Sequence, residues 1–92
     1  TNNIFSNSPN PFSDETEISF YLHATGHVEM KIYTYTGKLV ARLVNKKLEK
    51  GIHTLRWNGL GSYGKNLPDG VYLCELKTGL KSRSILMQKF KN

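Results

Sequence analysis

Hydrophobic and polar side chains alternate along several short stretches of this chain. Ile18, Phe20 and Leu22 are each separated by one residue, and a similar spacing recurs in residues 28–33 and 71–76. A period of two residues is that of a β-strand with one buried face. No stretch of the sequence sustains the helical period of 3.6 residues. The pattern predicts an all-β domain with six or seven strands, at about residues 18–23, 28–33, 39–44, 51–57, 71–76 and 82–90.

Glycines, prolines and charged residues mark the segments between the predicted strands. Residues 35–38 are predicted to form a tight hairpin turn, in which Gly37 can adopt the positive φ that such turns need. Residues 45–50 are rich in lysine and are predicted to be a charged connection. Residues 1–17 are polar and contain two prolines, so they are predicted to form an extended lead-in with Phe12 as its apolar anchor.

The segment from Trp57 to Tyr72 gives the strongest indication of the architecture. It places a tryptophan at the end of one predicted strand and a tyrosine at the start of the next. Glycine and proline are too dense between them for a helix or a strand interior. With the regular spacing of the short strands, this predicts one immunoglobulin-like β-sandwich of about seven antiparallel strands over residues 1–92. The residues that carry the structural motif are Gly37, Trp57, Gly59, Gly70, Val71 and Tyr72.

Composition and charge narrow the classes of partner. The chain has 92 residues, of which 38% are hydrophobic and 22% charged, as in an ordinary globular domain. Its formal charge of +6 would suit an acidic partner such as an anionic polysaccharide. Because the basic residues are spread along the chain and no nucleic-acid-binding motif is present, we expect a solvated basic surface and no nucleic-acid partner. No run approaches the roughly 18 apolar residues of a membrane span, so we expect no membrane insertion.

Candidate chemical groups are sparse. Cys74 is the only cysteine and alternates in phase with Tyr72 and Leu76, which predicts a buried thiol rather than a reactive one. His23 and His27 flank a predicted turn, but the sequence offers no obvious third ligand for a metal. The glycine-rich loop lacks the carboxylates that calcium requires. We therefore expect no catalytic residue, no metal site and no cofactor.

Several motifs occur in an order that resembles a known family. Residues 8–12 followed by residues 16–20 resemble the opening motif of the type A C-terminal sorting domains of the type IX secretion system, which occur in Bacteroidetes-type bacteria. The immunoglobulin-like domain of the flagellar hook-capping protein shares the central motifs. The other motifs resemble the hairpin, the centre and the closing basic strand of the sorting-domain family. They are residues 28–33 with 37–40, 51–59 with 68–72, and 84–91.

The resemblance implies a non-catalytic module that directs a covalently joined upstream cargo domain across the outer membrane. The parent protein would be exported to the periplasm, and its cargo would then reach the cell surface or the medium. In many members the domain is removed and the cargo is attached to anionic lipopolysaccharide. The implied partners are proteins of the outer-membrane secretion machinery. The implied recognition residues are Ile85, Leu86, Met87, Gln88, Lys89, Phe90 and Lys91 in the tail, with Pro9, Asn10, Pro11 and Phe12 in the opening motif.

A second reading of the sequence is an accessory immunoglobulin-like module of a secreted multidomain enzyme, either carbohydrate-binding or a spacer. Carbohydrate binding needs a flat row of exposed aromatic side chains. Four tyrosines are out of phase with the predicted core or lie in loops, and they are Tyr21, Tyr33, Tyr35 and Tyr63. Their arrangement in space therefore discriminates between the two hypotheses.

Overall fold

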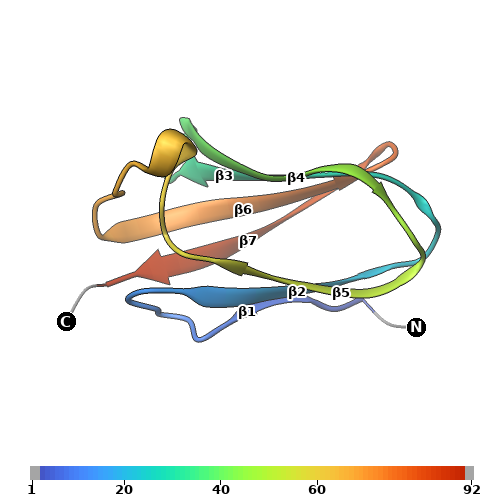
Figure 1. Cartoon of the computed structure of the whole chain (residues 1–92), viewed down its shortest axis with the longest axis horizontal. Helices are drawn as coiled ribbons and strands as arrows, with labels where there is room; N and C mark the ends of the chain where they lie inside the picture. Colours follow the sequence, from blue (N-terminus) through green and yellow to red (C-terminus); the bar gives the residue numbers. More distant parts are fainter. Residues whose placement is uncertain (1–2, 91–92) are drawn as a thin grey trace.

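Two antiparallel sheets pack face to face in the computed structural model, which describes residues 3–90 (Figure 1). The strands are β1 (Phe5–Ser8), β2 (Thr16–Leu22), β3 (Gly26–Thr34), β4 (Leu39–Leu48), β5 (Gly51–Trp57), β6 (Gly70–Thr78) and β7 (Lys81–Lys89). A short 3₁₀ turn, η1 (Ser62–Gly64), follows β5. One sheet has the order β1-β2-β5 and the other has the order β4-β3-β6-β7. The predicted all-β sandwich of about seven antiparallel strands is confirmed.

The alternating residues predicted from the sequence face the space between the sheets. Ile18, Phe20, Met30 and Ile32 are fully buried, and Trp57 is only 2% exposed. Burying a large apolar side chain is worth about 1.5–3 kcal/mol, so these positions dominate the stability of a domain of this size. The remaining buried apolar residues are Phe5, Phe12, Leu22, Val28, Ala41, Leu67, Tyr72, Cys74, Leu76 and Met87.

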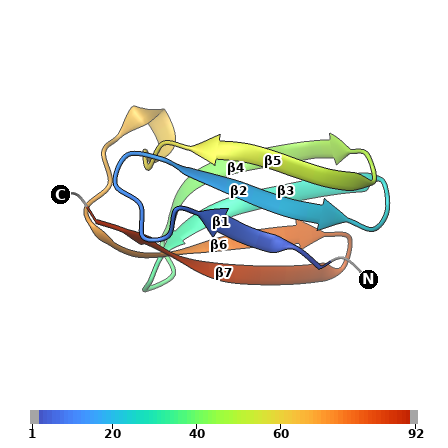
Figure 2. The ribbon, with the colours of Figure 1, turned by 90° about the horizontal axis from the view of Figure 1, so that it is seen from below.

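The edges of the two sheets lie on matching sides of the sandwich. Figure 2 shows β1 on the same side as β7, whereas β5 lies on the side of β4. β1 and β7 also contact one another, although they belong to different sheets. Each sheet therefore has one edge strand, β1 or β7, on the same side of the sandwich.

β4 is longer than the strand predicted from the sequence, and residues 45–50 are not simply a charged connection. The strand continues to Leu48, because residues 44–48 pair with the first half of β3. Lys46 and Lys47 point to solvent from within the strand, so their charges need no separate loop. Two register shifts between β3 and β4 also disturb the simple alternation in β4. Both shifts lie between Leu39 and Val44, within the predicted part of the strand. Residues 45–48 were missed because Asn45, Lys46 and Lys47 are consecutive exposed polar residues that show no period of two.

The predicted lead-in contains a strand. Phe5–Ser8 pairs with β2 as β1, at the edge of the three-stranded sheet, and Phe5 is buried. The polar residues of β1 gave no alternating signal over four positions. The predicted hairpin turn forms as expected, since Gly37 has a φ of 98° and its N–H donates to Thr34 O at 2.9 Å.

Cys74 lies in the core on β6 and is not exposed to solvent at all. Burial raises the pKa of the Cys74 thiol to about 12, because the thiolate would lose its hydration. The thiolate is the form that reacts, so the folded protein holds this cysteine in its unreactive form.

We predict that a disulfide reagent at pH 8 labels Cys74 at least about a hundredfold more slowly in the folded protein than in urea. Unfolding returns the thiol to an ordinary pKa of about 8.5 and exposes it to the reagent. Absorbance of the released thiolate measures both rates. Equal rates in the two states would contradict the buried position.

Candidate functional site

The opening motif, Pro9–Phe12, leaves β1 and crosses to the outer edge of β7 in the other sheet. Phe12 forms an isolated parallel bridge with Lys89. The Phe12 N–H donates to Gln88 O at 2.9 Å, and the Phe90 N–H donates to Phe12 O at 2.9 Å. The peptide bonds before Pro9 and Pro11 are both cis. The motif thus adds a very short extra strand to the end of β7.

The Asn10 side chain extends this pairing along β7. Its Oδ1 accepts the Gln88 N–H at 2.9 Å, and its Nδ2 donates to Leu86 O at 3.2 Å. A side-chain amide carries both a donor and an acceptor, so it can replace a backbone peptide at a sheet edge. Together, Asn10 and Phe12 satisfy four backbone groups of residues 86–90, at the end of β7 and just beyond it.

Thr16, on β2, holds the opening motif in place by a hydrogen bond to Pro9. It is buried to 1% exposure at the start of β2. Its hydroxyl donates to Pro9 O at 2.9 Å and accepts from Asn7 Nδ2 at 3.1 Å. Thr16 was not among the site residues predicted from the sequence. Thr16 is in phase with Ile18 on the alternating stretch, and that spacing was the signal for its burial.

An aromatic cluster lies beneath the motif. The Phe12 ring centroid is 5.6 Å from that of Trp57, and Trp57 is 6.0 Å from Tyr72 in an edge-on arrangement. Such pairs are worth about 0.5–1.5 kcal/mol beyond their burial. The polar atoms of the Trp57 and Tyr72 rings are satisfied within the loop, because Trp57 Nε1 donates to Leu60 O at 3.0 Å and the Tyr72 hydroxyl donates to Pro68 O.

The environment of Tyr72 also affects its ionisation. Burial raises the pKa of Tyr72 above its ordinary value, and the negative charge of Asp69 raises it further. The phenol is therefore held in its neutral form, in which the hydroxyl can donate to Pro68 O. This bond ties the end of the loop to the start of β6.

Lys89 joins the loop to the tail strand. Its Nζ donates to Leu67 O, and its aliphatic chain passes over Gly59. Gly59 has a φ of +73°, and a Cβ at this position would lie 2.8 Å from Lys89 Cε and 3.4 Å from Phe12 Cε2. Glycine is required here both by the backbone conformation and by the close approach of two side chains.

The structure brings most of the predicted site residues into one assembly. The opening motif, the tail strand, Trp57, Gly59 and Tyr72 all meet at one end of the sandwich, and Gly70 pairs with Lys89. Gly37 lies apart, in the β3–β4 turn. Within the tail, Met87 is buried and Ile85 half-buried, whereas Leu86 is 52% and Phe90 is 47% exposed. Lys91 lies outside the described residues.

The four candidate tyrosines do not form a row. Tyr21 is on β2 and Tyr33 is on β3, which belong to different sheets. Tyr35 lies in the β3–β4 turn, and Tyr63 projects from η1. Tyr33 also hydrogen-bonds Glu75 at 3.3 Å. The feature that would have favoured carbohydrate binding is therefore missing from the part of the chain that the structure describes.

The histidines have separate partners. His23 Nε2 is 3.2 Å from Asn3 Oδ1, and His27 Nε2 is 2.7 Å from Asn45 Oδ1. Residues 3–90 contain no group of three metal-ligating side chains placed to hold a metal ion. Over the same range, no helix has the length and apolar character needed to cross a membrane.

We predict that Gly59→Ala destabilises the protein by about 1–2 kcal/mol, because a side chain in this left-handed conformation is strained and meets Lys89. Chemical denaturation followed by tryptophan fluorescence measures the change. Gly26→Ala is the matched control, since Gly26 has free space around it and an unstrained backbone. Equal losses in the two variants would refute the close packing at Gly59.

We predict that Asn10→Ala lowers the free energy of unfolding by about 1 kcal/mol and speeds amide hydrogen exchange at Gln88. The side chain that accepts the Gln88 N–H is removed, while the Phe12 pairing remains. Asn10→Asp keeps the acceptor for Gln88 and should preserve its protection. Unchanged exchange at Gln88 in Asn10→Ala would show that the motif does not hold this edge.

Comparison with known proteins places this architecture in a family. Residues 6–81 match the FlgD Ig-like domain family. FlgD from P. aeruginosa is 26% identical, with a TM-score of 0.64, over 82% of this chain and 58% of that one. None of the curated proteins compared with the chain matches it.

Two proteins from Porphyromonas gingivalis share the fold. PorU superposes with a TM-score of 0.73 at 19% identity, over 96% of this chain and 9% of PorU. PorZ, described as an essential bacterial surface component of the type-IX secretion system, superposes with a TM-score of 0.64 at 22% identity, over 95% of this chain and 11% of PorZ. The chain thus spans a small fraction of either protein. Because the family match extends over most of its length, the chain belongs to the FlgD Ig-like domain family.

Proposed function

We propose that this chain is a non-catalytic C-terminal sorting domain, recognised by the outer-membrane machinery of the type IX secretion system. The observation that carries the proposal is the union of the opening motif with the tail strand. These are the two segments that the resemblance assigns to recognition, and their hydrogen bonds join them into one surface. A partner that contacts this surface would read both segments only when the domain is folded.

The fold neighbours support the proposal. PorZ is described as a surface component of the type-IX secretion system, and both PorZ and PorU contain a domain of this fold within a much longer chain. A shared fold alone does not fix a function. It does agree with a module that is joined to a larger cargo and passes through the periplasm with it.

The recognition surface has a definite chemical character. Leu86, Gln88 and Phe90 follow one another at every second residue, on the face of β7 opposite to the buried Met87. The two apolar side chains are about half exposed, and the rigid opening motif borders them. Exposed apolar residues beside a fixed polar rim are typical of a protein-binding surface.

The position of the upstream cargo leaves this surface accessible. β1 begins at the end of the sandwich opposite to the end at which β7 finishes (Figure 1). A covalently joined upstream domain would therefore enter away from the recognition surface. After export, the cargo would reside at the cell surface or in the medium. There, the net charge of +6 on this chain favours an anionic polysaccharide as a further partner.

We predict that residues 1–92, fused behind a reporter with an export signal, carry the reporter to the surface of a type IX-competent bacterium. Leu86→Ser and Phe90→Ser should each reduce the surface fraction severalfold, because each removes an apolar anchor worth about 1–2 kcal/mol. The ratio of surface to periplasmic reporter is the measurement.

Ile52→Ser is the matched control, since Ile52 is 56% exposed on β5, far along the chain from the tail. It should leave export unchanged. Thermal unfolding of all three variants checks that the domain remains folded. The proposal fails if the unmodified fusion stays in the periplasm, or if the Ile52 variant loses export as completely as the tail variants do.

A further inference from the structure

The outer edge of β7 is divided into two halves. β7 pairs with β6 over its nine residues without a register shift, so its backbone groups face β6 and the outer edge in strict alternation. The backbone N–H and C=O of Gln88 point to the outer edge, because they bond the opening motif. By the same alternation, the backbone N–H and C=O groups of Leu86, Ser84 and Ser82 also point to the outer edge. Among residues 3–90, the backbone groups of Ser82 and Ser84 on this edge have no hydrogen-bond partner.

We propose that the open half of this edge, Ser82–Leu86, binds an extended acidic peptide segment as an added strand. Unpaired edge groups are a template for such pairing, and main-chain hydrogen bonds supply the affinity. The opening motif already occupies the neighbouring positions up to Phe90. An added strand can therefore pair only with the part of β7 that precedes these positions.

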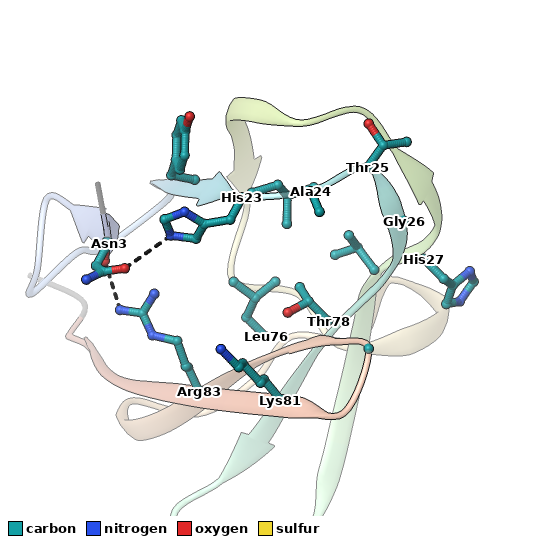
Figure 3. A pocket seen from close by; sticks show the side chains of 14 residues that line it. Asn3, His23, Ala24, Thr25, Gly26, His27, Leu76, Thr78, Lys81 and Arg83 are labelled. Atoms are coloured by element: carbon teal, nitrogen blue, oxygen red, sulfur yellow. Dashed lines mark hydrogen bonds between the residues drawn. The ribbon is translucent and has the colours of Figure 1, made fainter. Parts of the chain in front are cut away.

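The charged side chains on the core-facing side of β7 determine which partner segment can bind. Lys81 and Arg83 are exposed and project from the same face of β7 as the buried Met87. Both side chains line an open cavity of about 850 Å³. Figure 3 shows them at its rim. None of the residues that line this cavity is acidic. Neither cation forms a salt bridge within residues 3–90.

Arg83 is held in a position that leaves its charge available. One of its terminal nitrogens donates to Asn3 O at 2.9 Å (Figure 3). Its guanidinium carbon lies 5.7 Å from the centre of the Phe5 ring. Both contacts are to uncharged groups. A guanidinium has five N–H donors, so others remain for a carboxylate.

The outer face of the same half favours a different kind of side chain. Glu75 lies beside Ser82 there, and its Oε2 accepts the Ser82 hydroxyl at 3.2 Å. Lys77, opposite Ser82, is exposed on the same face, so it and Glu75 leave that face without a net charge beside the strand. Leu86 offers half-exposed apolar surface there. The partner segment should therefore alternate acidic residues, which face Lys81 and Arg83, with apolar residues on the opposite face.

The same charges disfavour a second copy of this chain as the occupant. Pairing two β7 edges would bring two sets of Lys81 and Arg83 onto one face, where like charges repel. The edge of β4 is a weaker template, because its two register shifts interrupt the regular spacing of backbone groups. The open half of β7 is both regular and selective.

The experiment uses residues 1–92 and an end-blocked octapeptide of alternating glutamate and valine. Titration followed by NMR should shift the amides of Ser82, Ser84 and Leu86 and slow their hydrogen exchange. The amides of Gln88 and Phe90 should keep the protection they already have. An octapeptide of alternating lysine and valine should not bind. Because the measurement is made on the isolated chain, it succeeds or fails independently of the proposed secretion role.

Two N-methylated versions of the peptide distinguish an added strand from a charge contact. In one, every glutamate is N-methylated, and in the other, every valine. Only one set of N–H groups can face β7, so one peptide should lose binding and the other retain it. Equal binding by both, or no binding of the unmodified peptide at millimolar concentration, would overturn the proposal.

Variants of the chain test the two contributions separately. Lys81→Gln combined with Arg83→Gln should weaken binding about fivefold, whereas Lys47→Gln on β4 should not change it. Ser84→Pro should abolish binding, because it removes an outward N–H while leaving the pairing with β6 intact. Circular dichroism confirms that each variant is folded. Binding that survives Ser84→Pro in a folded protein would also refute strand addition.

Discussion

Phe12 connects the two sheets, and this connection constrains the end of the sandwich that holds the recognition surface. Its backbone pairs with β7 in the four-stranded sheet, while its ring packs on Trp57 from β5 of the three-stranded sheet. The chain can satisfy both only if the segment between β1 and β2 crosses from one sheet to the other. That crossing orders the motif, covers half of an exposed edge and closes one end of the core.

Edge strands explain why polar residues matter as much as the core here. A sandwich of two open sheets has four edges, and an uncovered edge invites unwanted pairing. On β7, part of the edge is covered by the opening motif, because the Asn10 side-chain amide bonds Leu86 O and the Gln88 N–H in place of a backbone peptide. Thr16 then holds Pro9 in place from β2. Residues that look like ordinary loop polar residues therefore determine which backbone groups remain free.

The period-two pattern predicted the buried faces of β2, β3 and β6, because alternation follows directly from strand geometry. It did not predict the second half of β4, where consecutive exposed polar residues conceal the period, or β1, which is too short to show one. The union of the opening motif with β7 could not be read from the sequence either. It depends on hydrogen bonds between residues 76 and 78 positions apart, and local pattern does not encode such pairings.

Lys81 and Arg83 show how one arrangement can serve stability and recognition together. Charges on the inner face of an edge strand cost little at the open end of a sandwich, and they prevent two copies from pairing through that edge. The same two charges lie beside backbone groups that still need partners. The positive charges that keep a second copy of the chain from pairing with β7 therefore favour an acidic segment. Both effects arise from the sign of the charge beside the free backbone groups.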